Sequence, residues 1–119
     1  MARKPLKEYF DSILNSIVED CEIGGYDREG YDYRLNYIFF EKDGYLIEGQ
    51  FELAADLIED GDGYWTPYTI IVRHVSINGV KVEVSWCDPE TDEEEEVPAE
   101  EIQALESYLE KNIPDAVEG

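Results

Sequence analysis

Histidine, cysteine and basic residues are scarce in this chain of 119 residues. It contains one histidine, two cysteines and nine lysines and arginines. A single histidine excludes a three-histidine zinc site, and the spacing of Cys21 and Cys87 matches no zinc or redox pattern. We therefore expect neither a metal centre nor a bound cofactor, and we interpret the two cysteines as small apolar residues.

Long apolar runs are also missing. No run exceeds four residues, whereas a helix that spans a bilayer needs about 20. The basic first residues, 1–7, are not followed by the apolar core of a signal peptide. We expect no membrane partner and a cytoplasmic location.

Acidic residues are the one group in large excess. Thirty aspartates and glutamates give a net charge of −21. Nucleic acid binding requires lysine and arginine to neutralise phosphates, so we expect no direct nucleic acid binding. A basic protein would instead be attracted to such a chain, although a large net charge also serves solubility alone.

Two segments have the apolar periodicity of amphipathic helices. In residues 5–21 and again in 98–112, apolar side chains recur at helical spacing, and a proline stands at the first position of each segment. We expect Gly24-Gly25 to end the first helix and Pro114 to end the second.

A first β-hairpin is predicted at residues 33–53. Strand-forming runs at 33–41 and 45–53 flank Asp43-Gly44, which tolerates the positive φ of a two-residue turn. Such a turn pairs Phe40 with Ile47 and Ile38 with Gly49. One face then carries the core residues Ile38, Phe40, Ile47, Phe51 and Leu53. The other face carries Leu35, Tyr37, Phe39 and Leu46 beside Glu48, Gln50 and Glu52.

A second hairpin is predicted at residues 68–87, with Asn78-Gly79 as its turn. This register pairs Ile77 with Val80 and places His74 opposite Glu83, away from the core. Residues 54–67, between the hairpins, are interpreted as a short extension followed by an acidic loop. A short fifth strand is expected to end at Val97.

The order helix, two hairpins, helix predicts one α+β domain over residues 1–119. Hairpins give an antiparallel sheet of four or five strands, and two one-sided helices need a shared apolar surface. We therefore expect a two-layer sandwich in which the N- and C-terminal helices lie on one face. The opposite face meets solvent or a partner.

No pattern of catalytic residues is recognisable. A histidine beside a carboxylate can act as a general base, but no motif places a nucleophile next to His74. The loop at residues 60–63 begins like a calcium-binding loop, yet its fifth position is Tyr64 and its twelfth is Ile71. Both positions should supply oxygen ligands. We predict no catalytic residue and no metal ligand.

Exposed aromatic and acidic residues are the candidate partner-binding groups. Tyrosine and tryptophan are enriched in binding hot spots, although they also pack at sheet edges, and acids before a helix also stabilise its first turn. The candidates are Tyr37, Phe39, Leu46, Tyr64, Trp65, Asp92, Glu93, Glu94, Glu95 and Glu96.

These patterns favour a small acidic interaction protein that is not an enzyme and binds a basic protein. One version of this hypothesis is an inhibitor that mimics DNA on a DNA-handling protein. The alternatives are a small carboxylate-dependent enzyme, with or without a divalent cation, and a homodimer that buries the exposed hairpin face.

Overall fold

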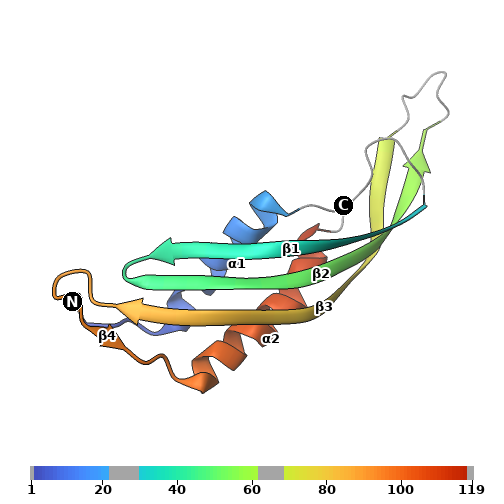
Figure 1. Ribbon diagram of the computed structural model, residues 1–119. Coiled ribbons are helices and arrows are strands. Elements are labelled where there is room, and N and C mark those ends of the chain that lie inside the picture. Colours follow the sequence, from blue (N-terminus) through green and yellow to red (C-terminus); the bar gives the residue numbers. More distant parts are fainter. Residues whose placement is uncertain (1, 22–29, 62–68, 118–119) are drawn as a thin grey trace.

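Three long strands dominate the computed structural model, which describes residues 2–21, 30–61 and 69–117. They are β1 (Gly30–Lys42), β2 (Tyr45–Asp60) and β3 (Thr69–Cys87), and a short strand, β4 (Glu94–Glu95), follows them. In the described part of the chain they form one antiparallel sheet in the order β1-β2-β3-β4 (Figure 1). The predicted α+β class with a four-stranded antiparallel sheet is therefore confirmed.

Both helices lie on the same side of this sheet (Figure 1). A 3-10 turn, η1 (Leu6–Tyr9), leads into α1 (Phe10–Asp20), and α2 (Ala99–Val117) follows β4. The prediction that Pro114 ends the second helix is wrong, since α2 continues through it. Its neighbour Ile113 is fully buried, and this packing holds a last turn that proline disfavours. No helix of the described residues is long and apolar enough to cross a membrane.

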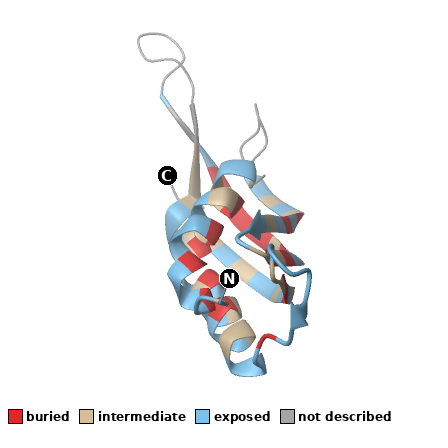
Figure 2. Cartoon of the chain, turned by 90° about the vertical axis from the view of Figure 1, so that its left-hand side faces the viewer, coloured by how far each residue is buried: buried red, intermediate tan, exposed pale blue. Residues whose placement is uncertain are grey.

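The core lies between the helices and the inner face of the sheet. Figure 2 shows the buried residues concentrated where these two layers meet. The helices contribute Ile13, Ile17, Leu105, Leu109 and Ile113, and the strands contribute Ile38, Ile47, Phe51, Leu53, Val82 and Trp86. The outer face of the sheet has no helix of the described chain upon it.

The first hairpin has the predicted register. Phe40 pairs with Ile47 and Ile38 with Gly49. Asp43 and Gly44 have φ values of 50° and 91°, so both turn residues adopt the left-handed conformation of a type I′ turn.

The second predicted hairpin is wrong. β3 continues through Asn78-Gly79 and pairs with β2, which itself extends to Asp60, beyond its predicted end at residue 53. At Gly79, which has a φ of 68°, the pairing steps from Gln50–Lys81 to Glu52–Asn78. From one pair to the next the chain advances three residues along β3 but only two along β2, so β3 contains one extra residue. The Asn-Gly pair therefore forms a β-bulge, which uses the same positive φ as a turn.

An ionic cluster fixes the N-terminal segment to β2 and α2. The Arg3 guanidinium donates to the Tyr45 hydroxyl at 2.8 Å and lies 2.9 Å from the Glu101 carboxylate. Tyr45 is fully buried and donates to the Lys4 carbonyl, and Glu101 also accepts the Leu6 N–H at 3.0 Å. Arg3 is the main reason that the pKa of Glu101 lies below its ordinary value.

Gly79→Ala should lower the free energy of unfolding by about 1 kcal/mol, since an L-residue is strained at positive φ. An added Cβ meets no atom within 4 Å, so the cost is in the backbone alone. Gly79→Asn should lose less because asparagine tolerates this conformation. Urea denaturation measures both variants. An equal loss for both variants would contradict the positive φ at Gly79.

Glu101→Gln should destabilise the protein by about 1 kcal/mol at pH 7, because it removes a partly exposed charge-assisted bond to Arg3. A carboxylate whose native pKa is lowered stabilises the fold above its unfolded pKa, near 4.3. This contribution disappears as the pH falls through the native pKa. The unfolding curves of variant and wild type should therefore converge in acid. Glu100→Gln, which removes a neighbouring exposed charge, is the control.

Candidate interaction surface

A row of exposed apolar and aromatic side chains follows the outer face of β1. Alternate residues of a strand point to opposite faces, and the odd-numbered residues of β1 point away from the helices. The row consists of Tyr31, Tyr33, Leu35, Tyr37 and Phe39, each between 45% and 74% exposed. We call it the aromatic row. It occupies an edge strand, because β1 has β2 as its only neighbour within the described sheet.

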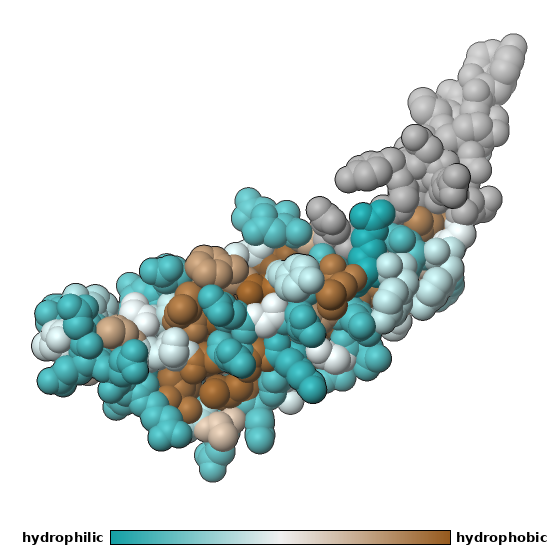
Figure 3. All heavy atoms as spheres, in the orientation of Figure 1, coloured by the Kyte–Doolittle hydropathy of each residue, from teal (hydrophilic) through white to brown (hydrophobic). Residues whose placement is uncertain are grey.

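An acidic row on β2 borders the aromatic row. Glu48 lies opposite Phe39, Glu52 opposite Leu35 and Asp56 opposite Tyr31. Tyr33 donates a hydrogen bond to Glu52, which is the main reason that the pKa of its phenol is raised. Figure 3 shows that hydrophobic and hydrophilic side chains share the face of the molecule seen in Figure 1. The surface therefore combines apolar contact area with negative charge.

Like charges face each other within this surface. Glu48 lies directly opposite Glu83 on β3, and an acid pair in this position destabilises a sheet. A hollow of about 590 Å³ lies beside them, and Lys81 and Glu106 also contribute to its lining. Three carboxylates against one ammonium group leave this hollow with an excess of negative charge.

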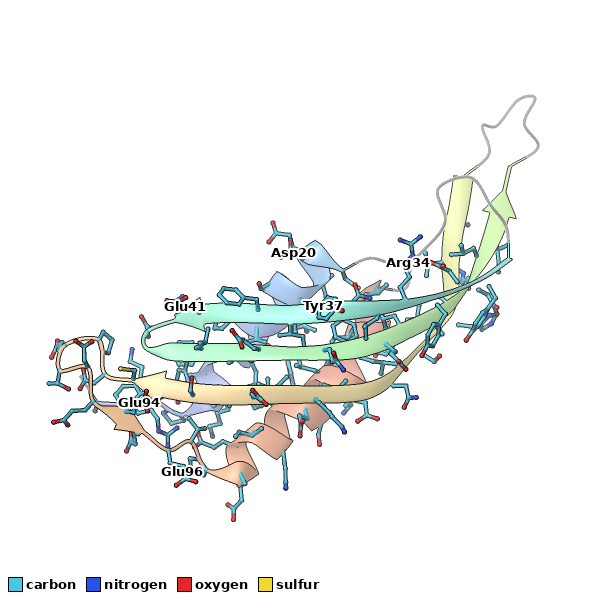
Figure 4. The ribbon with its side chains drawn as sticks, in the orientation of Figure 1. Asp20, Arg34, Tyr37, Glu41, Glu94 and Glu96 are labelled. Atoms are coloured by element: carbon cyan, nitrogen blue, oxygen red, sulfur yellow. The ribbon has the colours of Figure 1, made fainter. Side chains whose placement is uncertain are left out.

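The sequence-predicted binding residues fall into two places. Tyr37 and Phe39 lie in the aromatic row, whereas residues 92–96 lie at and around β4, on the opposite edge of the sheet (Figure 4). Leu46 lines a second, acidic groove of about 440 Å³ together with Asp92 and Glu94. The structure therefore separates the predicted residues into two surfaces. Tyr64 and Trp65 lie outside the described residues.

The acidic run at β4 is held by turns and one ion pair. The Asp88 carboxylate accepts the Glu90 N–H at 2.8 Å, which lowers the pKa of Asp88. Glu95 lies 3.4 Å from the Arg3 guanidinium, so its charge is partly neutralised within the chain. Asp88 and Glu95 thus have structural roles of their own, and the aromatic row is the stronger candidate surface.

His74 forms a pair that the sequence did not predict. Its Nδ1 lies 3.0 Å from the Asp56 carboxylate, whereas the sequence placed it opposite Glu83. The cause is a second bulge, where His74 adopts a φ of 55° between the Asp56–Arg73 and Ala54–Ser76 pairs. His74 is 75% and Asp56 51% exposed, and solvent weakens such a pair. It extends the acidic row without forming an enclosed catalytic site.

Cys87 is the one thiol in the acidic groove. Partial burial, followed by the charges of Asp92, Glu94 and Asp88, raises its pKa. Reactive cysteines need a lowered pKa, because the thiolate is the nucleophile. Within the described residues, no three His, Cys, Asp or Glu side chains are arranged to hold a metal ion. The raised pKa of Cys87 disfavours nucleophilic chemistry at this thiol.

In a Cys21→Ser background, Cys87 should react with iodoacetamide at pH 8 more slowly than a cysteine in an unstructured peptide. Glu94→Gln should speed the reaction, since each pKa unit removed raises the thiolate fraction about tenfold. Glu110→Gln, on the exposed surface of α2, should change nothing. Fast alkylation of the parent protein would contradict the raised pKa.

Comparisons with protein-family models, with curated proteins and with solved structures found no match.

Proposed function

We propose that this protein is a non-catalytic interaction module, which binds a cationic protein through the outer face of β1 and β2. The observation that carries this proposal is the aromatic row beside the acidic row. Contiguous exposed apolar patches are uncommon on soluble proteins and mark interaction sites. The net charge of −21 determines the charge that such a partner needs.

The two rows have complementary roles in binding. Tyr37 and Phe39 offer large, rigid rings, which supply contact area at a low cost in conformational entropy. Their faces also attract lysine and arginine side chains through cation–π interactions. Glu48 lies opposite Phe39 and Glu52 opposite Leu35, one on each side of the Tyr37–Gln50 pair, and both attract the same cations over a longer range. A partner with basic and apolar side chains in alternation satisfies both rows.

The Glu48–Glu83 pair supports this proposal independently. In the free protein the two carboxylates repel each other across the strands. A partner cation placed between them removes this repulsion, so binding recovers free energy that folding lost. Stability given up at a surface is typical of functional sites.

The elongated shape favours a narrower version of the same function, mimicry of DNA. The molecule measures 62 × 23 × 18 Å along its principal axes. A DNA duplex 62 Å long carries roughly 36 phosphate charges, at about one charge per 1.7 Å of its axis. The protein carries a net charge of −21. A mimic would be displaced from its partner by duplex DNA. A partner that binds the aromatic row and is indifferent to DNA would exclude this version.

Glu83→Lys should stabilise the free protein and weaken its binding to the partner. The change replaces a like-charge pair by an ion pair with Glu48, which should raise the free energy of unfolding by about 0.5 kcal/mol. The same lysine repels a cationic partner. Glu110→Lys makes an equal charge change on α2, away from the aromatic row, and is the matched control. Urea denaturation measures stability.

Binding is tested by affinity capture from the source organism with the immobilised wild type and three variants. Proteins that bind the wild type and Glu110→Lys, but neither Glu83→Lys nor the double variant Tyr37→Ser/Phe39→Ser, are the expected partners. Their retention should fall as salt is raised. If all four proteins capture the same set, the outer face is not the binding surface and the proposal fails.

A further inference from the structure

We propose that the partner binds as an extended segment, which adds a strand to the free edge of β1 along residues 35–40. This inference rests on the proposed function and specifies how the partner enters. Strand addition at a sheet edge combines main-chain hydrogen bonds with side-chain contacts on alternate residues. The geometry of β1 supports both components.

The aromatic row supplies free main-chain groups as well as side chains. In an antiparallel pair, the N–H and C=O groups of successive residues point to opposite sides. The Cys87 N–H donates to the Gly44 carbonyl at 2.9 Å, so even-numbered residues of β2 point toward β3 and odd-numbered ones toward β1. By the β1–β2 register, even-numbered residues of β1 bond to β2. The main-chain groups of Leu35, Tyr37 and Phe39 therefore point to the free edge.

The opposite edge of the sheet is covered by the chain itself. The Val82 N–H, which points away from β2, donates to the Glu106 carboxylate of α2 at 3.1 Å. Trp86, further along the same edge, pairs with Glu95 of β4. Among the described residues, no strand pairs with the other side of β1. Within the part of the chain that the structure describes, one edge of the sheet is therefore closed and the other is open.

Residues 35–40 lack the usual protection of an edge strand. Exposed edges normally carry charges, prolines or bulges that prevent pairing with other chains. The segment Leu-Asn-Tyr-Ile-Phe-Phe contains neither charge nor proline, and both bulges lie on β3. The Asp32–Arg34 ion pair, at 3.0 Å, precedes the segment. An open, uncharged edge in a chain with 30 acidic residues is the position where a partner strand fits.

Charge identifies the occupant as a cationic segment. On the inner side, a strand next to β1 would extend over α1, the helix that contacts β1. This helix has exposed acids, Glu19 and Asp20, and no basic residue. On the outer side, lysine side chains would cross the rings of Tyr37 and Phe39 toward Glu48. A second copy of this chain would instead bring together two bodies of charge −21, which repel each other.

The probe is a short synthetic peptide of alternating lysine and valine, titrated into the full-length protein. Amide hydrogen exchange by NMR gives the direct measurement. In the free protein, the amides of Asn36, Ile38 and Phe40 should be protected, whereas those of Leu35, Tyr37 and Phe39 exchange. The peptide should slow exchange of this second set. A glutamate–valine peptide should leave it unchanged.

Two variants separate main-chain pairing from side-chain contact. Tyr37→Ala removes the ring and keeps the N–H, whereas Tyr37→Pro removes both. Proline is tolerated at an edge position whose N–H faces away from the sheet, and circular dichroism confirms that both variants fold. Tyr37→Pro should bind the peptide roughly tenfold more weakly than Tyr37→Ala, the loss expected for one hydrogen bond. N-methylation of alternate peptide residues should weaken binding to the wild type similarly.

Several results would overturn strand addition. Equal affinities of the proline and alanine variants, together with unchanged binding of the N-methylated peptide, would show side-chain docking alone. Strand addition would then fail while the interaction function stands. Failure of the peptide to bind, when captured basic proteins still require Tyr37 and Phe39, would have the same meaning. A dimer of the free protein in light scattering, with the second set of amides already protected, would assign the edge to a second copy.

Discussion

The apolar contact between the two helices and a single face of the sheet is the constraint on which the rest of the structure depends. Ile13 and Ile17 of α1 and Leu105 and Leu109 of α2 are buried against the inner strand residues. Because both helices pack against the same face of the sheet, no helix of the described residues covers the outer face. A strand alternates its side chains between faces. Every buried residue on β1 therefore has neighbours that point outward.

β3 is 19 residues long, and its side-chain alternation shifts by one residue at each of two bulges. At the His74 bulge its inward-facing residues change from Val72, which lies opposite the buried Leu57, to Val75 and Ile77, which pack against the core. They change again to Val80 and Val82 at the Gly79 bulge. Each bulge inserts one residue, so the apolar alternation resumes on the same face. A long pair without bulges would have pointed part of this apolar set toward solvent.

The same property explains why sequence patterns predicted part of the fold and missed another part. A two-residue turn and a one-residue bulge both shift the alternation by one position, and both accept Asn-Gly at positive φ. The pattern around Asn78-Gly79 therefore fits either structure, and only pairing with the distant β2 decides between them. Asp43-Gly44 carried no such ambiguity, because each flanking run has the other as its partner.

The predicted site residues divide for the same reason. Tyr37 and Phe39 were predicted on an exposed face because their register depends on one local turn. The pairing of His74 with Asp56 depends on a strand contact 18 residues apart along the chain, and it was missed. The distance between the acidic run at residues 92–96 and the aromatic row depends on the order of the strands in the sheet. The amino-acid composition of the chain does not indicate this order. Strand neighbours far along the chain cannot be predicted from local patterns, and they also decide whether a pair such as Asn78-Gly79 forms a turn or a bulge.

The negative charge of the chain and the open edge of β1 act together in determining which strand can bind. An uncharged edge segment is a hazard, because it can pair with any strand, including its own copy. Repulsion between exposed like charges extends over about 8–10 Å at physiological salt, whereas hydrogen bonds and ring contacts act only at contact distance. An approaching acidic or identical chain therefore meets repulsion before it reaches the residues that would bind it. A cationic strand meets attraction over the same distance, so the excess of acid selects which strand reaches the edge.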